Sequence, residues 1–226
     1  MNVELMDSMG SDLTVVNAAR VSFAKEKQAL GWSGVTGEKL RPVIHDTDVR
    51  LIRFLAEHNH WSPFSHVFLQ FRVKAPIFVA RQLGKHQVGL AWNEVSRRYV
   101  DYEPEFYTPE KWRLRAENVK QGSSSETTEY NIASTMQFVQ QTYDNLLKEG
   151  VAPEMARMVL PQNMYTEWYW SGSLYAFARV CQLRLDSTAQ VEVQEIARQL
   201  SAHCLTLFPH SWNALMKGTY DERITD

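Results

Sequence analysis

A run of cationic and amide side chains between residues 81 and 99 has the composition of a binding site. Its cations are Arg81, Lys85, Arg97 and Arg98, and they are interspersed with Gln82, His86, Gln87, Asn93, Glu94 and Ser96. Guanidinium and ammonium groups bind anions, and amides hydrogen-bond to the edges of heterocycles. The run therefore predicts a site for a phosphorylated, nitrogen-rich small molecule, with a solvated basic surface as the structural alternative.

Known nucleotide and metal motifs do not explain this run. Neither GxGxxG nor GxxxxGK[ST] is present, so a Rossmann or P-loop site is not indicated. His58, His60 and His66 fall within nine residues, but no Cys and no HExxH accompany them. Structural or ligand-contacting histidines are favoured over a zinc site, and we expect no metal. A metal-dependent hydrolase built on these histidines is the most distant functional alternative.

Further candidate side chains lie in the second half of the sequence. Arg157 has apolar neighbours, and a largely buried Arg would need an anionic partner such as a carboxylate or a substrate phosphate. Arg179, Arg184 and Asp186 could form a site or a helix end with a surface ion pair. Cys181 has no local His, so buried packing is favoured over a nucleophilic role, although the nearby arginines could lower its pKa.

The bulk composition limits the function further. The chain has 226 residues, 44% of them hydrophobic, which suits one domain with a full core. Lys and Arg number 24 against 26 Asp and Glu, so a nonspecific nucleic-acid binder is not indicated. Two cysteines favour a reducing cytoplasm. The N-terminus lacks the pattern of a signal peptide, and no apolar run is long enough to span a membrane.

Periodicity and breakers predict the elements that position these residues. We expect strands at residues 3–6, 70–74 and 165–170, because the middle one alternates polar and apolar side chains and the last is rich in aromatic residues. Helices are expected at residues 13–19, 49–57, 76–82, 127–148, 153–159, 174–183 and 189–207. Asp12 is the expected cap of the first helix, and Asp46 or Thr47 that of the second. Residues 25–45 and 101–125 are interpreted as loops.

The irregular mixture of strands and helices favours the α+β class. We expect a single domain over residues 1–226, with a central, mainly antiparallel sheet flanked by helices.

Several ordered motifs resemble those of the flavin-dependent thymidylate synthases. That family carries Arg-His-Arg followed by Ser-x-Asn-Glu-x-Ser-x-Arg-Tyr, and this chain has Lys85-His86-Gln87 followed by the block from Ala91 to Tyr99. Supporting blocks, spread over nearly the full length, are Ala18–Phe23, His60–His66, Val73–Gln82, Ala156–Pro161 and Leu183–Gln190.

The resemblance implies an FAD-dependent enzyme that converts dUMP to dTMP. Methylenetetrahydrofolate would supply the carbon and NADPH the reducing equivalents. The enzyme would be a cytoplasmic homotetramer with active sites at subunit interfaces, binding no nucleic-acid polymer. No cysteine would act as the nucleophile, because the flavin hydride activates the ring.

The resemblance also assigns roles to individual residues. Arg184 would contact the pyrimidine and favour ionisation at N3, since a guanidinium stays protonated and stabilises negative charge on the ring. The implied dUMP-binding set is Gln82, Leu83, Gly84, Lys85, Glu94, Val95, Ser96, Arg97, Arg98, Arg157 and Arg184. The implied FAD-binding set is Ser62, Lys85, His86, Gln87, Glu94, Ser173 and Arg179.

The chain departs from the family pattern mainly at the flavin-binding positions. Lys85 and Gln87 replace two signature arginines, and one extra residue precedes Asn93. Ser173 and Tyr175 stand where the family often has Asn and Arg, and Thr188 stands where it often has His. These changes motivate an alternative function, a flavin-free sensor or scaffold that binds dUMP on the same fold.

Overall fold

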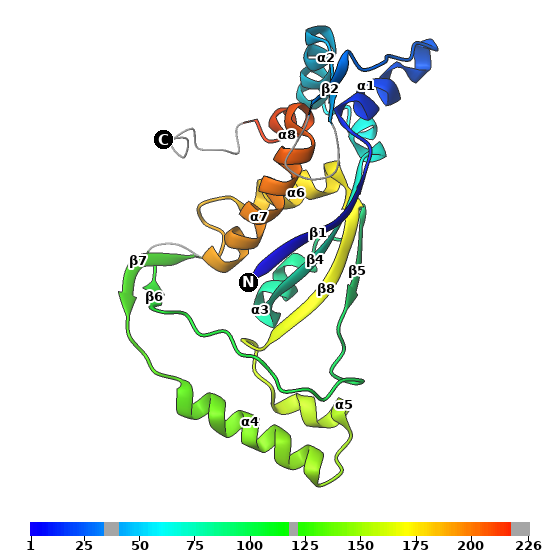
Figure 1. The fold of residues 1–226 in the computed structure, drawn as a ribbon. Coiled ribbons are helices and arrows are strands. Elements are labelled where there is room, and N and C mark those ends of the chain that lie inside the picture. The colour runs from blue at the N-terminus through cyan, green and yellow to red at the C-terminus, as the bar shows by residue number, and fades with distance from the viewer. Residues whose placement is uncertain (34–40, 118–121, 218–226) are drawn as a thin grey trace.

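A four-stranded antiparallel sheet forms the centre of the molecule (Figure 1). The computed structural model describes residues 1–33, 41–117 and 122–217. The strand order is β1-β4-β8-β5, with β1 at Asn2–Met9, β4 at Phe68–Pro76, β8 at Tyr165–Ser173 and β5 at Leu90–Glu94. The expected α+β class with an antiparallel sheet flanked by helices is therefore confirmed.

Alternation of side chains gives the sheet one buried face. In β4, Leu69, Phe71 and Val73 are buried, whereas the residues between them are partly or fully exposed. Trp168 and Trp170 of β8 lie opposite Val73 and Phe71 and continue the same face. The predicted strands at 70–74 and 165–170 are confirmed and extended, and the predicted strand at 3–6 lies within β1.

Three helices cover the buried face. They are α3 at Ile77–Leu83, α6 at Leu174–Arg184 and α7 at Val191–Leu207. Phe177 of α6 packs edge-on against Phe71, with ring centroids 5.0 Å apart, and His203 of α7 lies 5.7 Å from the same ring. Because β4 and β8 are antiparallel, α3 and α6 begin at opposite ends of the sheet, and their C-terminal ends meet where Arg184 of α6 donates to the Gln82 carbonyl of α3 at 3.3 Å.

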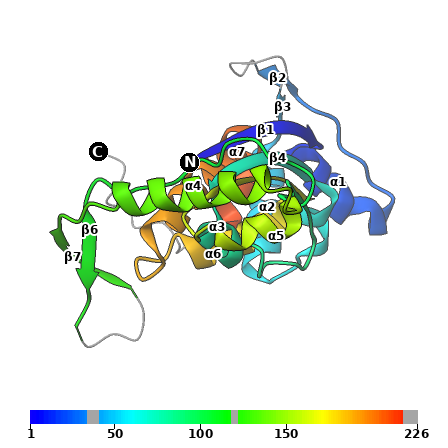
Figure 2. The same ribbon diagram turned by 90° about the horizontal axis from the view of Figure 1, so that it is seen from below.

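The remaining elements lie at the two ends of the sheet (Figure 1), and Figure 2, seen from below, shows β6 and β7 standing out to one side of it. One end carries α1 (Asp12–Arg20), η1 (Val21–Phe23), β2 (Gly31–Ser33), β3 (Arg41–Val43), α2 (Asp46–Glu57), η2 (Ser62–His66) and α8 (Pro209–Leu215). Standing away from the sheet at the other end are β6 (Trp112–Arg115), β7 (Ser123–Thr128), α4 (Ala133–Lys148), α5 (Pro153–Ala156) and η3 (Arg157–Val159). Within the described ranges, no helix has both the length and the apolar character needed to cross a membrane.

Several predicted boundaries were wrong for tertiary reasons. Residues 101–125 contain β6 and part of β7, and residues 25–45 contain β2 and β3, although 34–40 lie outside the described residues. The expected helix at 127–148 begins only at Ala133, because Thr127 and Thr128 pair with Arg113 and Trp112 in the β6–β7 hairpin. Pairing partners that are distant in sequence leave no local signal of this kind.

The expected helix caps were also wrong. Ser11, not Asp12, caps α1, and His45 precedes α2 in place of Asp46 or Thr47. The buried Asp12 carboxylate instead accepts hydrogen bonds from the backbone N–H groups of His210 (3.1 Å) and Ser211 (2.8 Å), at the start of α8. Asp12 therefore caps a helix almost two hundred residues away, which only the tertiary structure reveals.

Candidate functional site

The run from 81 to 99 ends one helix, turns, and begins a strand. Helix α3 ends at Leu83, and Gly89, with φ +76°, adopts a conformation that other residues rarely take before β5 begins. The turn crosses closely over β8: a Cβ added to Gly172 would lie only 2.5 Å from the Gly89 carbonyl oxygen. The absence of a side chain at Gly172 thus sets where the turn that carries His86 can lie.

Arg184 meets this turn from the C-terminal end of α6. Its Nε donates to His86 Nε2 at 2.9 Å, and its Nη2 donates to the Gln82 carbonyl at 3.3 Å. Within the described ranges, the guanidinium makes no ion pair, and its Nη1 makes no hydrogen bond. Arg184 is therefore held in one orientation while part of its donor capacity stays available to a ligand.

The environment of His86 keeps its imidazole neutral. Burial lowers the pKa of His86, and the charges of Arg184 and Arg179 lower that pKa further. A neutral ring that accepts at Nε2 must carry its proton on Nδ1. His86 can therefore act as a hydrogen-bond acceptor for Arg184 at neutral pH without adding a charge of its own.

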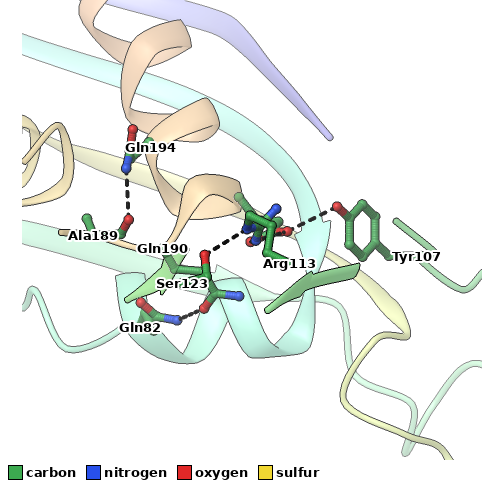
Figure 3. A network of polar contacts seen from close by, with 8 residues as sticks. Gln82, Tyr107, Arg113, Ser123, Ala189, Gln190 and Gln194 are labelled. Atoms are coloured by element: carbon green, nitrogen blue, oxygen red, sulfur yellow. Dashed lines mark hydrogen bonds and ion pairs between the residues drawn. The ribbon is translucent and has the colours of Figure 1, made fainter. Parts of the chain in front are cut away.

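A polar cavity of about 450 Å³ opens beside Arg184. Its walls are Gln82, Arg184, the turn residues Thr188, Ala189 and Gln190, and the hairpin residues Arg113, Gly122 and Ser123. Figure 3 shows the polar contacts of this wall, where Gln82 donates to Gln190 and Arg113 contacts Ser123. Two guanidinium groups on one cavity suit a ligand with anionic groups and a polar ring.

A larger cavity of about 600 Å³ lies on the other side of the same wall. Arg113, Ser123 and Gln190 line both cavities. The larger one is mainly apolar and is lined also by Phe78, Tyr107, Pro109, Lys111, Trp112, Ile132, Met136, Pro161, Gln162, Asn163 and Glu192.

The second half of the run lies at the far end of β5. Glu94 accepts hydrogen bonds from Thr166 Oγ1 at 2.7 Å and Trp92 Nε1 at 3.2 Å. Ser96 Oγ accepts from Arg98 Nε at 3.1 Å. Arg97, only 7% exposed, donates to the Tyr102 carbonyl and lies 4.2 Å from the centre of the Tyr102 ring.

The structure thus does not bring the two halves of the predicted site together in one chain. In the part of the chain that the structure describes, no hydrogen bond or ion pair joins Glu94–Arg98 to Gln82, His86 or Arg184. The length of β5 separates them, roughly 13 Å for the four steps of about 3.3 Å between its first and last residues. Leu83 is buried in the core and Gly84 follows it, so these two belong to the Arg184 side.

Arg157 is exposed, and the expectation that it would be largely buried was wrong. Its Nε donates to the Glu154 carbonyl at 3.3 Å. The reason is that η3 lies beyond the sheet next to α4 and α5, where apolar neighbours in the sequence do not become neighbours in the core (Figure 1).

Of the expected flavin contacts, Lys85 and Gln87 flank His86 and Arg179 lies near enough to lower its pKa, whereas Glu94 lies at the far end of β5. Lys85, Gln87 and Arg179 are exposed, and neither Lys85 nor Arg179 has a carboxylate partner within the described residues. Ser62 is exposed at the start of η2, and Ser173 is buried, accepting the Ala176 N–H at 3.2 Å as the cap of α6.

Beside these residues, the rings of the exposed Trp61 and of Tyr175 lie 6.2 Å apart. Two cations without a carboxylate partner in the described residues, together with an aromatic pair, suit a ligand that carries phosphate groups and a ring system. Of the residues that depart from the family pattern, Lys85 keeps a positive charge, whereas Gln87 offers only amide hydrogen bonds.

The remaining sequence candidates have structural roles. Cys181 is buried with its Sγ 3.6 Å from the Ala197 carbonyl, and burial raises its pKa, so the packing interpretation is confirmed. His58 stacks on Phe54 with ring centroids 4.1 Å apart. Among the described residues, no group of three or more His, Cys, Asp and Glu side chains has the arrangement of a metal site.

Sequence reasoning missed the residues of the cavity wall. Arg113, Ser123 and Glu192 lie outside the motif blocks, and Gln190, at the end of the Leu183–Gln190 block, was assigned no role. A local signal for the hairpin was available in the turn-favouring Gly122 and in the β-branched Thr127 and Thr128 that follow it by five and six residues.

The comparisons with known proteins identify the family of this chain. The family model described as thymidylate synthase complementing protein matches residues 4–210. Flavin-dependent thymidylate synthase of Thermus thermophilus is 39% identical, covering 98% of this chain and 79% of that protein. The enzyme of the same name from Thermotoga neapolitana is 37% identical, covering 96% and 92%.

A solved structure also matches. The UMP/dUMP methylase PolB from Streptomyces cacaoi, crystallised with 5-Br dUMP, superposes with a TM-score of 0.77 at 31% identity, covering 96% of this chain and 94% of that one. The match of a family model to most of the chain and the identity to full-length relatives lead to one conclusion: the chain belongs to the flavin-dependent thymidylate synthase family of enzymes.

Proposed function

We propose that this protein catalyses the FAD-dependent reductive methylation of dUMP to dTMP. Methylenetetrahydrofolate is the carbon donor and NADPH the reductant. The observation that carries the proposal is Arg184, which His86 and Gln82 hold at the wall of a polar cavity in a member of this family. The dUMP-analogue complex of the similar methylase supports a uridine nucleotide as the ligand of that cavity.

Arg184 is the proposed catalytic residue. Its two existing hydrogen bonds leave Nη1 available to the pyrimidine. A guanidinium remains charged at any physiological pH, and a fixed donor next to a ring nitrogen stabilises the anion formed when N3 loses its proton. Because the donor is oriented before the ligand binds, little reorganisation is needed when the charge develops.

The dUMP site draws on both halves of the run. Gln82, Leu83, Gly84 and Lys85 lie on the Arg184 side, whereas Glu94, Val95, Ser96, Arg97, Arg98 and Arg157 lie elsewhere in the same chain. This separation supports a homotetramer in which a second copy completes each site. Arg98 and Arg157 are exposed and have no carboxylate partner in the described ranges, which suits residues that meet a phosphate across an interface.

Ser62, Lys85, His86, Gln87, Glu94, Ser173 and Arg179 are the residues proposed to hold FAD. When bound, the flavin supplies the hydride that activates the ring. Of these residues, Lys85 and Arg179 offer unpaired positive charge to the diphosphate. Gln87 offers hydrogen bonds in place of the charge that an arginine would bring.

The exchange of two signature arginines for Lys85 and Gln87 also supports a second candidate, a flavin-free dUMP-binding sensor or scaffold. The side chains of Lys85 and Gln87 are exposed, and in the described part of the chain neither side chain has a partner that could take the place of a contact with the flavin. A cytoplasmic location is also proposed, because Cys181 and Cys204 are both free, buried thiols.

Three measurements test these functions. The purified protein is expected to show flavin absorbance or to acquire it when FAD is added, and to release tritium from 5-tritiated dUMP when supplied with methylenetetrahydrofolate and NADPH. Binding of FAD and dUMP is then titrated separately. A protein that binds dUMP but not FAD is the sensor or scaffold, and a protein that binds neither refutes both functions.

A further inference from the structure

An ion pair between Arg113 and the buried Glu192 joins the β6–β7 hairpin to α7. Arg113 Nη2 donates to Glu192 Oε1 at 2.7 Å and to Oε2 at 2.8 Å. Glu192 also accepts a hydrogen bond from Tyr107 Oη at 3.2 Å (Figure 3). Glu192 is buried, with 5% of the residue exposed, whereas the Arg113 side chain is 26% exposed, so the carboxylate lies out of water and the guanidinium only partly so.

The charge state of Glu192 depends on that pairing. Burial alone would raise the pKa of Glu192, but the hydrogen bond and the charge of Arg113 hold it below its ordinary value. Removing the guanidinium would leave a buried carboxylate without its cation, which is costly. The two partners are therefore expected to separate only together with a movement of the hairpin.

Arg113 also orders the hairpin internally. Its Nε donates to Ser123 Oγ at 2.9 Å, which links β6 to the first residue of β7. The regular pairing of the two strands is interrupted between Arg113 and Arg115, so this side-chain contact lies where the backbone ladder is irregular. One guanidinium thus connects both strands of the hairpin to the helix beneath them.

These contacts form the wall of the cavity beside Arg184. Arg113 and Ser123 face that cavity from the hairpin, and Gln82 and Arg184 face it from α3 and α6. Gln190 joins the two sides, because its amide oxygen accepts a hydrogen bond from Gln82 Nε2. On their far side, Arg113, Ser123 and Gln190 also line the apolar cavity of about 600 Å³.

We propose that Arg113 is a positioning residue, whose ion pair with Glu192 holds the hairpin in place as the outer wall of the nucleotide cavity. This inference rests on the proposed function of that cavity. The wall determines how completely the cavity encloses a nucleotide, and Arg184 remains the group that acts on the ring. Loss of the pair opens the polar cavity to solvent and to the apolar one, so it weakens nucleotide binding more than it slows the chemical step.

The test compares Arg113→Ala with the charge exchange Arg113→Glu/Glu192→Arg. For Arg113→Ala we expect KM for dUMP to rise about tenfold or more with kcat within about threefold of wild type, the pattern of lost uniform binding. The exchange is expected to restore KM to within about threefold. The matched control is Lys217→Ala, which removes an exposed pair with Glu57 (2.7 Å) outside both cavities and is expected to change neither constant.

Hydrogen exchange of residues 112–115 and 123–128 reports the hairpin without any nucleotide. Exchange there is expected to accelerate in Arg113→Ala and to be restored by the charge exchange. Should that double variant not fold, Arg113→Lys replaces it, with intermediate KM and intermediate exchange expected.

A KM that changes without a parallel change in hairpin exchange, or an Arg113→Ala variant with wild-type KM, overturns the proposal. A wild-type protein that does not bind dUMP refutes the proposed function instead.

Discussion

Removing the Arg184 side chain separates its catalytic role from its structural one. Arg184→Ala deletes the hydrogen bonds to His86 Nε2 (2.9 Å) and the Gln82 carbonyl (3.3 Å), together with the free donors on the cavity. The two partners keep access to water, because both residues are only partly buried. The variant therefore loses two hydrogen bonds without creating a buried, unpaired charge.

Arg184→Ala is expected to lower stability only modestly and turnover strongly. A hydrogen bond from a charged donor contributes about 1.5–3 kcal/mol when buried, and partial exposure reduces this, so we expect a loss of about 1–2 kcal/mol in the free energy of unfolding for the pair. Loss of one preoriented donor to a developing anion lowers kcat by about 10²–10³. Turnover should thus fall much further than stability.

Tritium release from 5-tritiated dUMP measures turnover, and urea denaturation measures stability. Arg198→Ala is the matched control, since Arg198 is an exposed arginine whose Nη2 donates to Gln194 on the same helix, at 2.7 Å. That control is expected to keep both wild-type values. Wild-type turnover in Arg184→Ala, or a loss of turnover explained by unfolding, would refute the reasoning.

Three further predictions concern His86, Gly172 and Cys181. Burial and then the charges of Arg184 and Arg179 lower the pKa of His86, so the neutral imidazole stabilises the fold fully above about pH 6.5, and this stability is lost as the pH falls through the lowered pKa. His86→Gln should therefore flatten the acidic part of the curve of unfolding free energy against pH. An unchanged slope in that variant would contradict the prediction. Gly172→Ala places a Cβ 2.5 Å from the Gly89 carbonyl oxygen. Thermal unfolding should therefore show that the free energy of unfolding falls by about 1–3 kcal/mol, and dUMP affinity should fall as well. A variant as stable as wild type would contradict the close packing. Cys181→Ala should keep kcat within about threefold, because the thiol is buried and its raised pKa makes it a poor nucleophile; loss of turnover in a folded variant would restore the nucleophilic interpretation.

Strong local periodicity made the central elements predictable. The alternation from Gln70 to Lys74 identified β4, and Pro76 marked the boundary with α3, because proline has a fixed φ and lacks the N–H that a strand interior requires. The hairpin was missed, since Arg113 and Thr127 pair only across a connection whose length no local pattern reveals. The predicted helix caps were wrong because a capping side chain can act on a helix that is distant in the sequence, as Asp12 does by capping α8 and not α1.

The residues of the candidate site were likewise predictable only in part. The family resemblance assigned Gln82 and Arg184 to the dUMP site and His86 to the flavin site, and the fold places all three within hydrogen-bonding distance of one another's groups. Motif spacing could not show that Glu94 to Arg98 lie at the other end of β5, because continuity in sequence does not imply one site once a strand intervenes.

The amino-acid sequence by itself determined the family, the α+β class and the identity of the cationic residues, since side-chain chemistry and short-range periodicity are local properties. Only the tertiary structure decided which of those residues share a cavity and added Arg113, Gln190 and Glu192 to its wall. It also decided that Arg184 donates to a neutral His86. Both the distance and the depressed pKa of His86 arise from packing between segments about a hundred residues apart, which no local pattern encodes.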